Sequence, residues 1–321
     1  MKEKLRVALI SGGKSAEREV SLKSGAQVRA ALDPEKYLPF DYDPKTDLHR
    51  LMADAPNLDV ALIILHGRFG EDGTLQGFLD LAGLPYQGSG VMSSALCMDK
   101  RATKQMYRFH GLPAARDVAL ERGKKFDPEN ILEQLGLPLA VKPCSEGSSI
   151  GISLVRTAEG LAPALAKAFE LDRFVLVEEF IEGREITASV LGNDELEALE
   201  LIEIIPGGNY EFFDYEAKYK PGASREVCPA LLDATLARQA KELGLRAHQA
   251  LFCRGYSRTD MIVARDGAFY LLETNTLPGM TETSLFPQAA AASGLPFPRL
   301  LDRLIELALA DVNKCGGVAR R

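Results

Sequence analysis

The residues best suited by type and spacing to bind a metal ion or to take part in catalysis belong to one segment near the end of the chain. Two apolar runs flank an Asp-Gly pair at 266–267, which is typical of a tight two-residue turn between antiparallel strands. That turn places Asp260 opposite Glu273 and Arg258 opposite Asn275. Because side chains alternate faces along a strand, these polar groups project from one face of the predicted hairpin.

Such a face favours a cation. Two carboxylates placed opposite each other, roughly 5 Å apart, repel unless positive charge lies between them. Asp, Glu and Asn supply hard oxygen ligands, and Mg²⁺ favours one or two carboxylates with water and phosphate oxygens. The hairpin therefore indicates a magnesium–nucleotide platform with Arg258 beside it. The alternative is an edge hairpin whose charges are simply solvated.

Two further segments have residues suited to binding a nucleotide. Lys142 ends an apolar strand, and residues 144–151 (CSEGSSIG) follow it, in which glycine and serine let backbone N–H groups approach phosphate oxygens. Glu178 and Glu179 end the apolar run at 174–179, where carboxylates can accept hydrogen bonds from adenine or ribose. The respective alternatives are an ordinary hairpin turn and a solvated strand end.

Three more loops place polar residues where α/β proteins bind ligands. Residues 12–21 follow the first strand, although they also fit a capped helix start. Residues 65–73 follow another strand and contain His66, which alone would more often be structural. Residues 280–284 follow the hairpin and can cap a helix whose N–H groups face an anion. The GKS sequence at 13–15 lacks the upstream glycine of a P-loop.

The elements that must position these residues alternate along the chain. Apolar strands at 5–10 and 59–65, followed by helices at 21–32 and 74–81, predict a parallel sheet with helices on its faces. Further expected elements are helices at 100–109, 159–169, 233–252 and 298–312 and strands at 138–141, 150–155 and 174–179. The stretch 206–222 is rich in glycine and tyrosine without periodicity, and is a candidate mobile lid.

Composition indicates a cytoplasmic globular enzyme. The 321 residues are enough for about two to three domains. A formal net charge of −7 opposes a nucleic-acid partner. The five cysteines are scattered without CxxC spacing, so they suit packing roles in a reducing cytosol. The first residues do not fit a secretory signal, and no apolar run approaches membrane-spanning length.

Taken together, these segments resemble the D-alanine–D-alanine ligases of the ATP-grasp superfamily. The similarity extends over nearly the whole chain in the family's order. It is carried by GGKSAEREVS at 12–21, LHGRFGEDGTLQG at 65–77, MDK at 98–100, VKP and EGSSIG within 141–151, YEAKY at 215–219 and LETNTLPGMT at 272–281. The resemblance implies an α/β fold with an N-terminal parallel-sheet domain at 1–96 and a two-lobed ATP-grasp domain at 97–184 and 185–321.

The resemblance also implies which residues bind the nucleotide and its metal ions. The expected ATP contacts are Lys100, Lys142, Ser149, Glu178, Glu185 and Lys218. Glu179, where many members carry lysine, is expected to make a backbone contact to adenine. Asp260, Glu273 and Asn275 would hold two Mg²⁺ or Mn²⁺ ions, in agreement with the hairpin.

The residues implied for substrate binding and catalysis are Glu17, His66, Ser148, Tyr219, Arg258, Gly279, Ser284 and Leu285. Glu17 would bind the ammonium group of the first D-alanine, and Ser148 and Tyr219 would join it in a network under the lid. Arg258 and the backbone N–H of Gly279 would stabilise an oxyanion.

The same resemblance implies the remaining contacts and the reaction. His66 would lie beside the first D-alanine, and Ser284 would hold the carboxylate of the second. Leu285 would be a further substrate contact. The reaction is ATP-dependent formation of D-alanyl-D-alanine through a D-alanyl phosphate, for peptidoglycan precursor synthesis, by a homodimer. Two alternatives stay open: a ligase for another amino acid or hydroxy acid pair, and a non-catalytic nucleotide sensor. Retention of Arg258 and both metal carboxylates disfavours the sensor.

Overall fold

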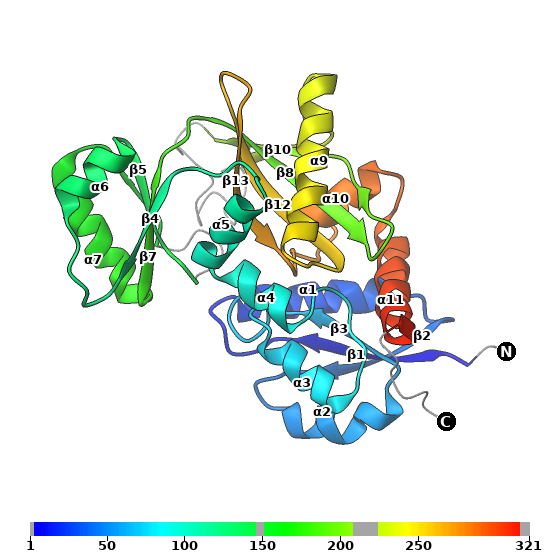
Figure 1. The fold of residues 1–321 in the computed structure, drawn as a ribbon. Helices are drawn as coiled ribbons and strands as arrows, with labels where there is room; N and C mark the ends of the chain where they lie inside the picture. Colours follow the sequence, from blue (N-terminus) through cyan, green and yellow to red (C-terminus); the bar gives the residue numbers. More distant parts are fainter. Residues whose placement is uncertain (1–2, 146–150, 208–223, 315–321) are drawn as a thin grey trace.

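Three β-sheets organise the chain, one in each of three successive regions (Figure 1). The structure is a computed structural model, and it describes residues 3–145, 151–207 and 224–314. Within these ranges, none of the helices combines the length and the apolar character needed to span a membrane.

The first sheet is parallel, in the order β2-β1-β3, and confirms the sheet expected at the N-terminus. Its elements are β1 (Leu5–Ser11), α1 (Arg18–Ala31), β2 (Tyr37–Tyr42), α2 (Leu48–Asp54), the 3₁₀ turn η1 (Ala55–Asn57), β3 (Val60–Ile64), α3 (Thr74–Ala82) and α4 (Val91–Met98). Every residue of β3 is buried, which explains its uninterrupted apolar sequence. The sequence does not predict strand β2, because Pro39 interrupts its apolar run. The proline is tolerated because β2 lies at the edge of the sheet.

The second sheet is antiparallel, in the order β4-β7-β5-β6, and follows helix α5 (Lys100–Phe109). Its elements are β4 (Asp117–Glu121), α6 (Pro128–Leu135), β5 (Leu139–Pro143), β6 (Ser153–Val155), the 3₁₀ turn η2 (Ala158–Gly160), α7 (Leu161–Leu171) and β7 (Phe174–Glu179). Helix α5 and strand β7 have the predicted bounds. The helix begins where expected because the carboxylate of Asp99 accepts the N–H groups of Arg101 and Ala102.

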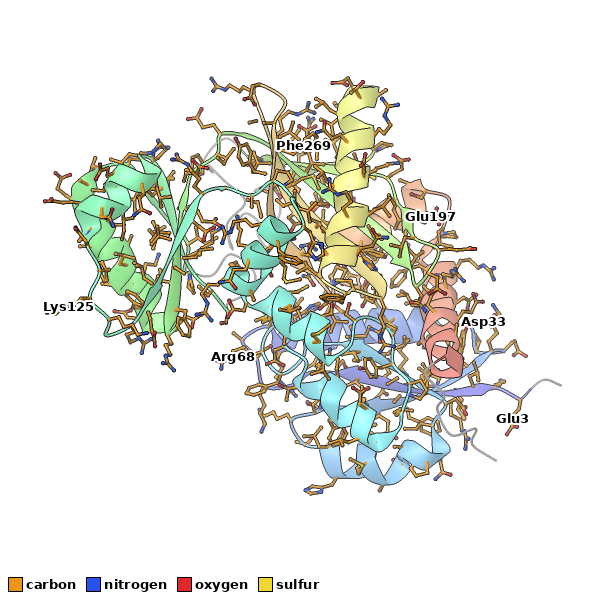
Figure 2. The ribbon with its side chains drawn as sticks, in the orientation of Figure 1. Glu3, Asp33, Arg68, Lys125, Glu197 and Phe269 are labelled. Atoms are coloured by element: carbon orange, nitrogen blue, oxygen red, sulfur yellow. The ribbon has the colours of Figure 1, made fainter. Side chains whose placement is uncertain are left out.

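The third sheet has the order β11-β10-β8-β12-β13, with β9 paired to β8. Its elements are β8 (Gly183–Gly192), β9 (Glu197–Ala198), β10 (Ile202–Pro206), β11 (Ser224–Val227), α9 (Ala234–Ala250), β12 (Gly255–Ala264) and β13 (Phe269–Asn275). Helix α9 covers the hairpin, since its Leu243 and Ala247 share a buried cluster with Phe269 and Leu271 of β13. Figure 2 shows Phe269 beside α9, whereas Arg68 and Lys125 project from the outside of the molecule.

The β12–β13 hairpin has the predicted pairs but a different turn. Arg258 pairs with Asn275 and Asp260 with Glu273, as the sequence predicts. The two-residue turn, however, is wrong: the strands are joined by a three-residue turn, in which Gly267 adopts a left-handed φ of 84°. Glycine has no Cβ to oppose this conformation.

A β-bulge between the turn and the polar pairs corrects the register. The ladder pairs Met261 with Leu271 but Asp260 with Glu273, so Leu272 is an extra residue on β13. Without the bulge, Asp260 would face Leu272, and the carboxylate of Glu273 would point to the other side of the sheet. The bulge therefore restores the pairs that the shorter turn would have produced.

The last two helices, α10 (Leu285–Ala292) and α11 (Phe297–Lys314), return the chain to the first sheet. Figure 1 shows α11 beside the N-terminal strands, and its Leu301 and Leu304 join the same buried cluster as Val7 and Ile63. The contact also has a polar component, formed by Asp302 of α11 with residues at the start of β2.

This polar contact yields a stability prediction. Asp302 accepts hydrogen bonds from the hydroxyl of Tyr37 at 2.8 Å and from Nζ of Lys36 at 2.7 Å. Burial opposes the charge of Asp302, but Lys36 and Tyr37 outweigh burial and lower its pKa. We expect Asp302→Asn to reduce the free energy of unfolding by about 1.5–3 kcal/mol at pH 7, measured by chemical denaturation.

The pH dependence has a defined sign. A carboxyl whose pKa is lowered by folding stabilises the folded state above its unfolded pKa and loses that contribution as pH falls through the folded value. The difference between wild type and Asp302→Asn should therefore shrink below roughly pH 4. Asp33→Asn is the control, because the side chain of Asp33 is 40% exposed and its carboxylate lies 3.8 Å from Nζ of Lys36. A difference that is constant across this pH range would contradict the assignment.

Candidate active site

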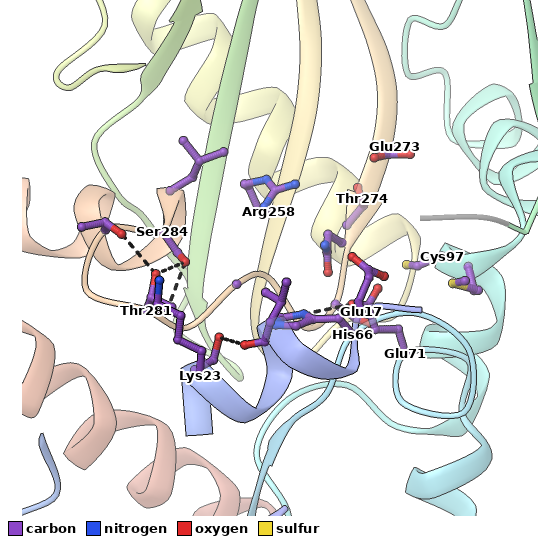
Figure 3. A pocket seen from close by; sticks show the side chains of 18 of the residues that line it. Glu17, Lys23, His66, Glu71, Cys97, Arg258, Glu273, Thr274, Thr281 and Ser284 are labelled. Carbon is purple, nitrogen blue, oxygen red and sulfur yellow. Dashed lines mark hydrogen bonds and ion pairs between the residues drawn. The ribbon is translucent and has the colours of Figure 1, made fainter. Parts of the chain in front are cut away.

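A cavity of about 440 Å³ opens between the N-terminal region and the β12–β13 hairpin. Its walls come from α1, the loop after β3, the junction of α4 with α5, and the hairpin with the segment that follows it. Residues of the predicted site that line it are Glu17, His66, Lys100, Arg258, Glu273, Asn275, Gly279, Ser284 and Leu285. Figure 3 shows Glu17, His66 and Glu71 gathered on one side and Thr281 with Ser284 on the other. The fold thus joins residues that lie far apart in the sequence.

Each carboxylate of the hairpin is matched by one cation. Arg258 donates two hydrogen bonds to Asp260, from Nε to Oδ1 at 2.7 Å and from Nη2 to Oδ2 at 2.8 Å. Nζ of Lys100 lies 3.0 Å from Oε2 of Glu273. Burial opposes both positive charges, but the carboxylates outweigh it and raise the pKa of Arg258 and of Lys100. Both cations therefore stay charged at the cavity wall.

The oxygen atoms of the hairpin suit a hard divalent cation. In the part of the chain that the structure describes, no three His, Cys, Asp or Glu side chains gather into a metal-binding group. The available donors are the carboxylates of Asp260 and Glu273 and the amide of Asn275, whose Oδ1 also accepts the N–H of Leu277 at 2.9 Å. Such a set fits Mg²⁺ when phosphate and water oxygens complete the coordination shell.

Glu17 reaches the cavity from the N-terminal end of α1. It is 8% exposed, and its carboxylate lies over Gly67, where a Cβ atom would approach Oε2 to 2.9 Å. Gly67 also has a left-handed φ of 72°, so a larger residue there would crowd the carboxylate and strain the loop. The N–H of Gly13 donates to Oδ1 of Asp43 at 2.9 Å, so this donor of the loop is already used within the protein.

Glu71 is an acid of the cavity that the sequence does not single out. Its Oε1 lies 3.6 Å from Nδ1 of His66, and burial raises the pKa of Glu71 although His66 opposes the shift. The other ring nitrogen of His66, Nε2, is buried without a hydrogen-bond partner among the described residues. The only sequence signal for Glu71 is its place in the glycine-rich loop after β3.

Ser284 lies at the opposite end of the cavity, at the N-terminus of α10. Its Oγ accepts the N–H of Thr281 at 3.1 Å and lies 2.7 Å from Oγ1 of Thr281. Gly279 approaches the same hydroxyl, since a Cβ atom on Gly279 would be 2.9 Å from Oγ. Thr281 therefore orients Ser284, and the lack of a side chain on Gly279 keeps its backbone close to both.

The part of the site where ATP is expected to bind contains a triad of buried charged side chains, in which one carboxylate contacts two lysines. One carboxylate oxygen of Glu178 lies 2.7 Å from Nζ of Lys104, and the other pairs with Nζ of Lys142. Burial opposes the charge of Glu178, but the two lysines outweigh it and hold its pKa at about 2. The sequence does not single out Lys104, although Lys104 lies one helical turn after Lys100 on α5.

Two further expected ATP contacts, Glu179 and Glu185, lie among the described residues and differ in their surroundings. The carboxylate of Glu179 accepts hydrogen bonds from the N–H and Nε of Arg116, and the N–H of Glu179 donates to the carbonyl of Arg116. A backbone contact from Glu179 to adenine would therefore use its carbonyl oxygen. Glu185 lies two residues before Thr187, which pairs with Asp260, so Glu185 projects from the same face of the sheet as Asp260.

Part of the predicted site lies outside the described residues. This part comprises Ser148, Ser149, Lys218 and Tyr219, together with residues 208–222 of the expected lid. Their roles stay predictions from the sequence.

Two family models match the chain. The model described as D-ala D-ala ligase N-terminus matches residues 43–89, and the model described as D-ala D-ala ligase C-terminus matches residues 106–306. The D-alanine–D-alanine ligase of Syntrophobacter fumaroxidans is 60% identical over 309 residues, which cover 96% of this chain and 99% of that protein.

Solved structures are similar over the same extent. A crystal structure of the D-alanine–D-alanine ligase from Bacillus anthracis complexed with ATP has a TM-score of 0.86 at 36% identity, with 97% of this chain and 100% of that chain covered. The VanG D-Ala:D-Ser ligase from Enterococcus faecalis has a TM-score of 0.82 at 33% identity, with 95% and 100% covered. By sequence and by fold, this chain belongs to the D-alanine–D-alanine ligase family of ATP-grasp enzymes.

Proposed function

We propose that the protein joins two D-alanine molecules into D-alanyl-D-alanine, with conversion of ATP to ADP and phosphate. The observation that carries the proposal is the cavity that holds Glu17 at one side, Ser284 at the other, and Arg258 with Glu273 in its wall. We further propose that the enzyme acts in the cytoplasm as a homodimer and supplies a peptidoglycan precursor.

The reaction needs an activated carboxylate. A carboxylate is a poor electrophile, because its leaving group at neutral pH would be oxide or hydroxide. Transfer of the γ-phosphoryl group of ATP to the first D-alanine gives an acyl phosphate, from which phosphate departs instead. Charge on the moving phosphoryl group must then be stabilised by positioned cations.

The chain offers those cations at the hairpin and beside it. Lys100 and Arg258 each stay charged through a carboxylate partner, and Lys142 is fixed by Glu178. Two Mg²⁺ or Mn²⁺ ions, held by the carboxylates and amide of the hairpin, would neutralise and orient the phosphate oxygens when bound. Lys218, from the lid segment, would reach the same phosphates.

Arg258 also suits the second step. The neutral amine of the second D-alanine attacks the acyl carbon, and the tetrahedral intermediate carries an oxyanion. The guanidinium group has five N–H donors, of which Asp260 accepts two, so donors are left for the oxyanion. The backbone N–H of Gly279 would be the second donor.

The two ends of the cavity would orient the two amino acids. Glu17 would accept the ammonium group of the first D-alanine, with Ser148 and Tyr219 closing the lid over it. Such a lid excludes water, which would otherwise hydrolyse the acyl phosphate. Ser284, oriented by Thr281 at the start of α10, would bind the carboxylate of the second, where the helix dipole favours a negative charge.

Phosphate release tests the function. The purified protein is given ATP and Mg²⁺ with D-alanine, L-alanine, D-serine or D-lactate separately, and the products are identified by mass. We expect release that requires D-alanine and yields its dipeptide. Release with a different acceptor would assign another ligase of this family, and ATP binding without turnover would favour a nucleotide sensor.

A first prediction concerns the metal ligands. Glu273→Gln should abolish ligation at ordinary Mg²⁺ concentrations while the protein stays folded, because a neutral amide is a weaker ligand and Glu273 is 28% exposed. Turnover is measured against Mg²⁺ concentration, and folding by circular dichroism. Asp266→Asn removes the same charge at the turn of the same hairpin and should leave turnover unchanged. Near-normal turnover in Glu273→Gln would refute the metal assignment.

A second prediction concerns Arg258. Arg258→Lys keeps a positive charge beside Asp260 but loses the planar fork that serves Asp260 and the oxyanion together. We expect kcat to fall by about 10²–10³-fold with little change in the KM for ATP. If the KM for ATP rose instead and kcat were preserved, Arg258 would be a nucleotide contact and not an oxyanion donor.

A third prediction concerns the first D-alanine. Glu17→Gln removes a charge-assisted hydrogen bond of about 1.5–3 kcal/mol, so the KM for the first D-alanine should rise by roughly 10- to 100-fold. Glu19→Gln is the matched control, since Glu19 is exposed two residues further along α1. Equal effects of the two substitutions on KM would argue against a specific contact from Glu17.

A further inference from the structure

Two cysteine thiols meet beside the cavity and take no part in the proposed reaction. Sγ of Cys97, in α4, lies 4.0 Å from Sγ of Cys253, in the turn between α9 and β12. The residues are 156 positions apart in the sequence, so only the tertiary fold brings them together. Cys97 lines the cavity, and Figure 3 shows it beside the group that contains Glu71.

The two thiols have unequal surroundings. Cys97 is 8% exposed, whereas Cys253 is partly exposed and accepts a hydrogen bond from the hydroxyl of Ser93 at 3.3 Å. The hydrogen bond that Ser93 donates favours the thiolate form of Cys253, whereas the contact between the two sulfur atoms favours neither thiol, because either can donate to the other. Because the thiolate is the reactive form, Cys253 is the better nucleophile of the pair.

We propose that Cys97 and Cys253 are a modification site, at which a low-molecular-weight disulfide oxidises the pair to a reversible intramolecular disulfide. The thiolate of Cys253 attacks one sulfur of the small disulfide, whose S–S bond breaks and releases one thiolate. Cys97 then loses its proton and attacks the sulfur of Cys253, which releases the second small thiol. Two protein thiols and one small disulfide thus give one protein disulfide and two small thiols.

The cross-link requires a small movement of the two sulfur atoms, next to the elements that carry Lys100 and Arg258. A disulfide has an S–S distance of about 2.0 Å, so the two sulfur atoms must approach by roughly 2 Å. Helix α4 ends at Met98, and Lys100 follows two residues later, with its Nζ 3.0 Å from Oε2 of Glu273. Cys253 stands just before β12, which carries Arg258. The cross-link therefore pulls together two elements that position the cations of the cavity.

The consequence for activity rests on the proposed function. If Lys100 and Arg258 serve ligation, a displacement on the order of 1 Å is enough to slow turnover strongly. We expect oxidation to lower turnover by about tenfold or more, and a thiol reductant to restore the rate.

The test uses the full-length protein and oxidised glutathione. Oxidation should remove two hydrogen atoms from the intact mass, and proteolysis should give one cross-linked species that joins the peptides of Cys97 and Cys253. Turnover should fall with the same time course and recover with dithiothreitol. This mass readout is independent of substrate, so the site can be tested even if ligation of D-alanine fails.

Two variants separate this pair from the other thiols. Cys253→Ala should form no cross-link and should keep its turnover in oxidised glutathione. Cys228→Ser is the matched control and should cross-link and lose activity as wild type does, because Cys228 packs elsewhere, 3.9 Å from the carbonyl of Gln288. Absence of the Cys97–Cys253 peptide would overturn the proposed site, and a cross-link that leaves turnover unchanged would overturn its effect on activity.

Discussion

The antiparallel pairing of β12 with β13 is the constraint on which the candidate site depends. It brings two carboxylates, an amide and a guanidinium group to one face, and the bulge at Leu272 keeps Asp260 opposite Glu273. Carboxylates this close require compensating charge. Arg258 supplies it from the same strand, whereas Lys100 supplies it from α5. Electrostatic balance therefore fixes the position of α5 relative to the hairpin.

The buried charges connect the second sheet, through α5, to the third. Glu178 of β7 holds Lys142 of β5 and Lys104 of α5, and Nζ of Lys104 also lies 3.3 Å from the carbonyl of Leu271 on β13. Burial of such charges is costly unless each has a partner, so the triad is stable in one arrangement of its strands and helix. That arrangement places Glu178 and Lys142, which are expected to bind ATP, next to Lys104, which contacts the hairpin expected to bind the metal ions.

Close backbone approach shapes the two ends of the cavity. Gly67 leaves room for the carboxylate of Glu17, and Gly279 leaves room for the hydroxyl of Ser284. The wall between them includes Cys97, whose contact with Cys253 ties α4 to the base of β12. A chemical change at these thiols would thus act on the same elements that hold the charged groups, which is why the pair is suited to regulation.

The sequence by itself determined those features that depend on neighbouring residues. Strand alternation predicted the polar face of the hairpin, the cap at Asp99 fixed the start of α5, and continuous apolar runs predicted the parallel sheet. The tertiary structure alone decided the turn and bulge of the hairpin, because a bulge is set by packing against adjacent strands and leaves no distinct local pattern. It also decided the partners of Lys104, Glu71 and Cys253. These contacts join residues far apart in the chain, and their energies come from burial and charge pairing that exist only once the chain has folded.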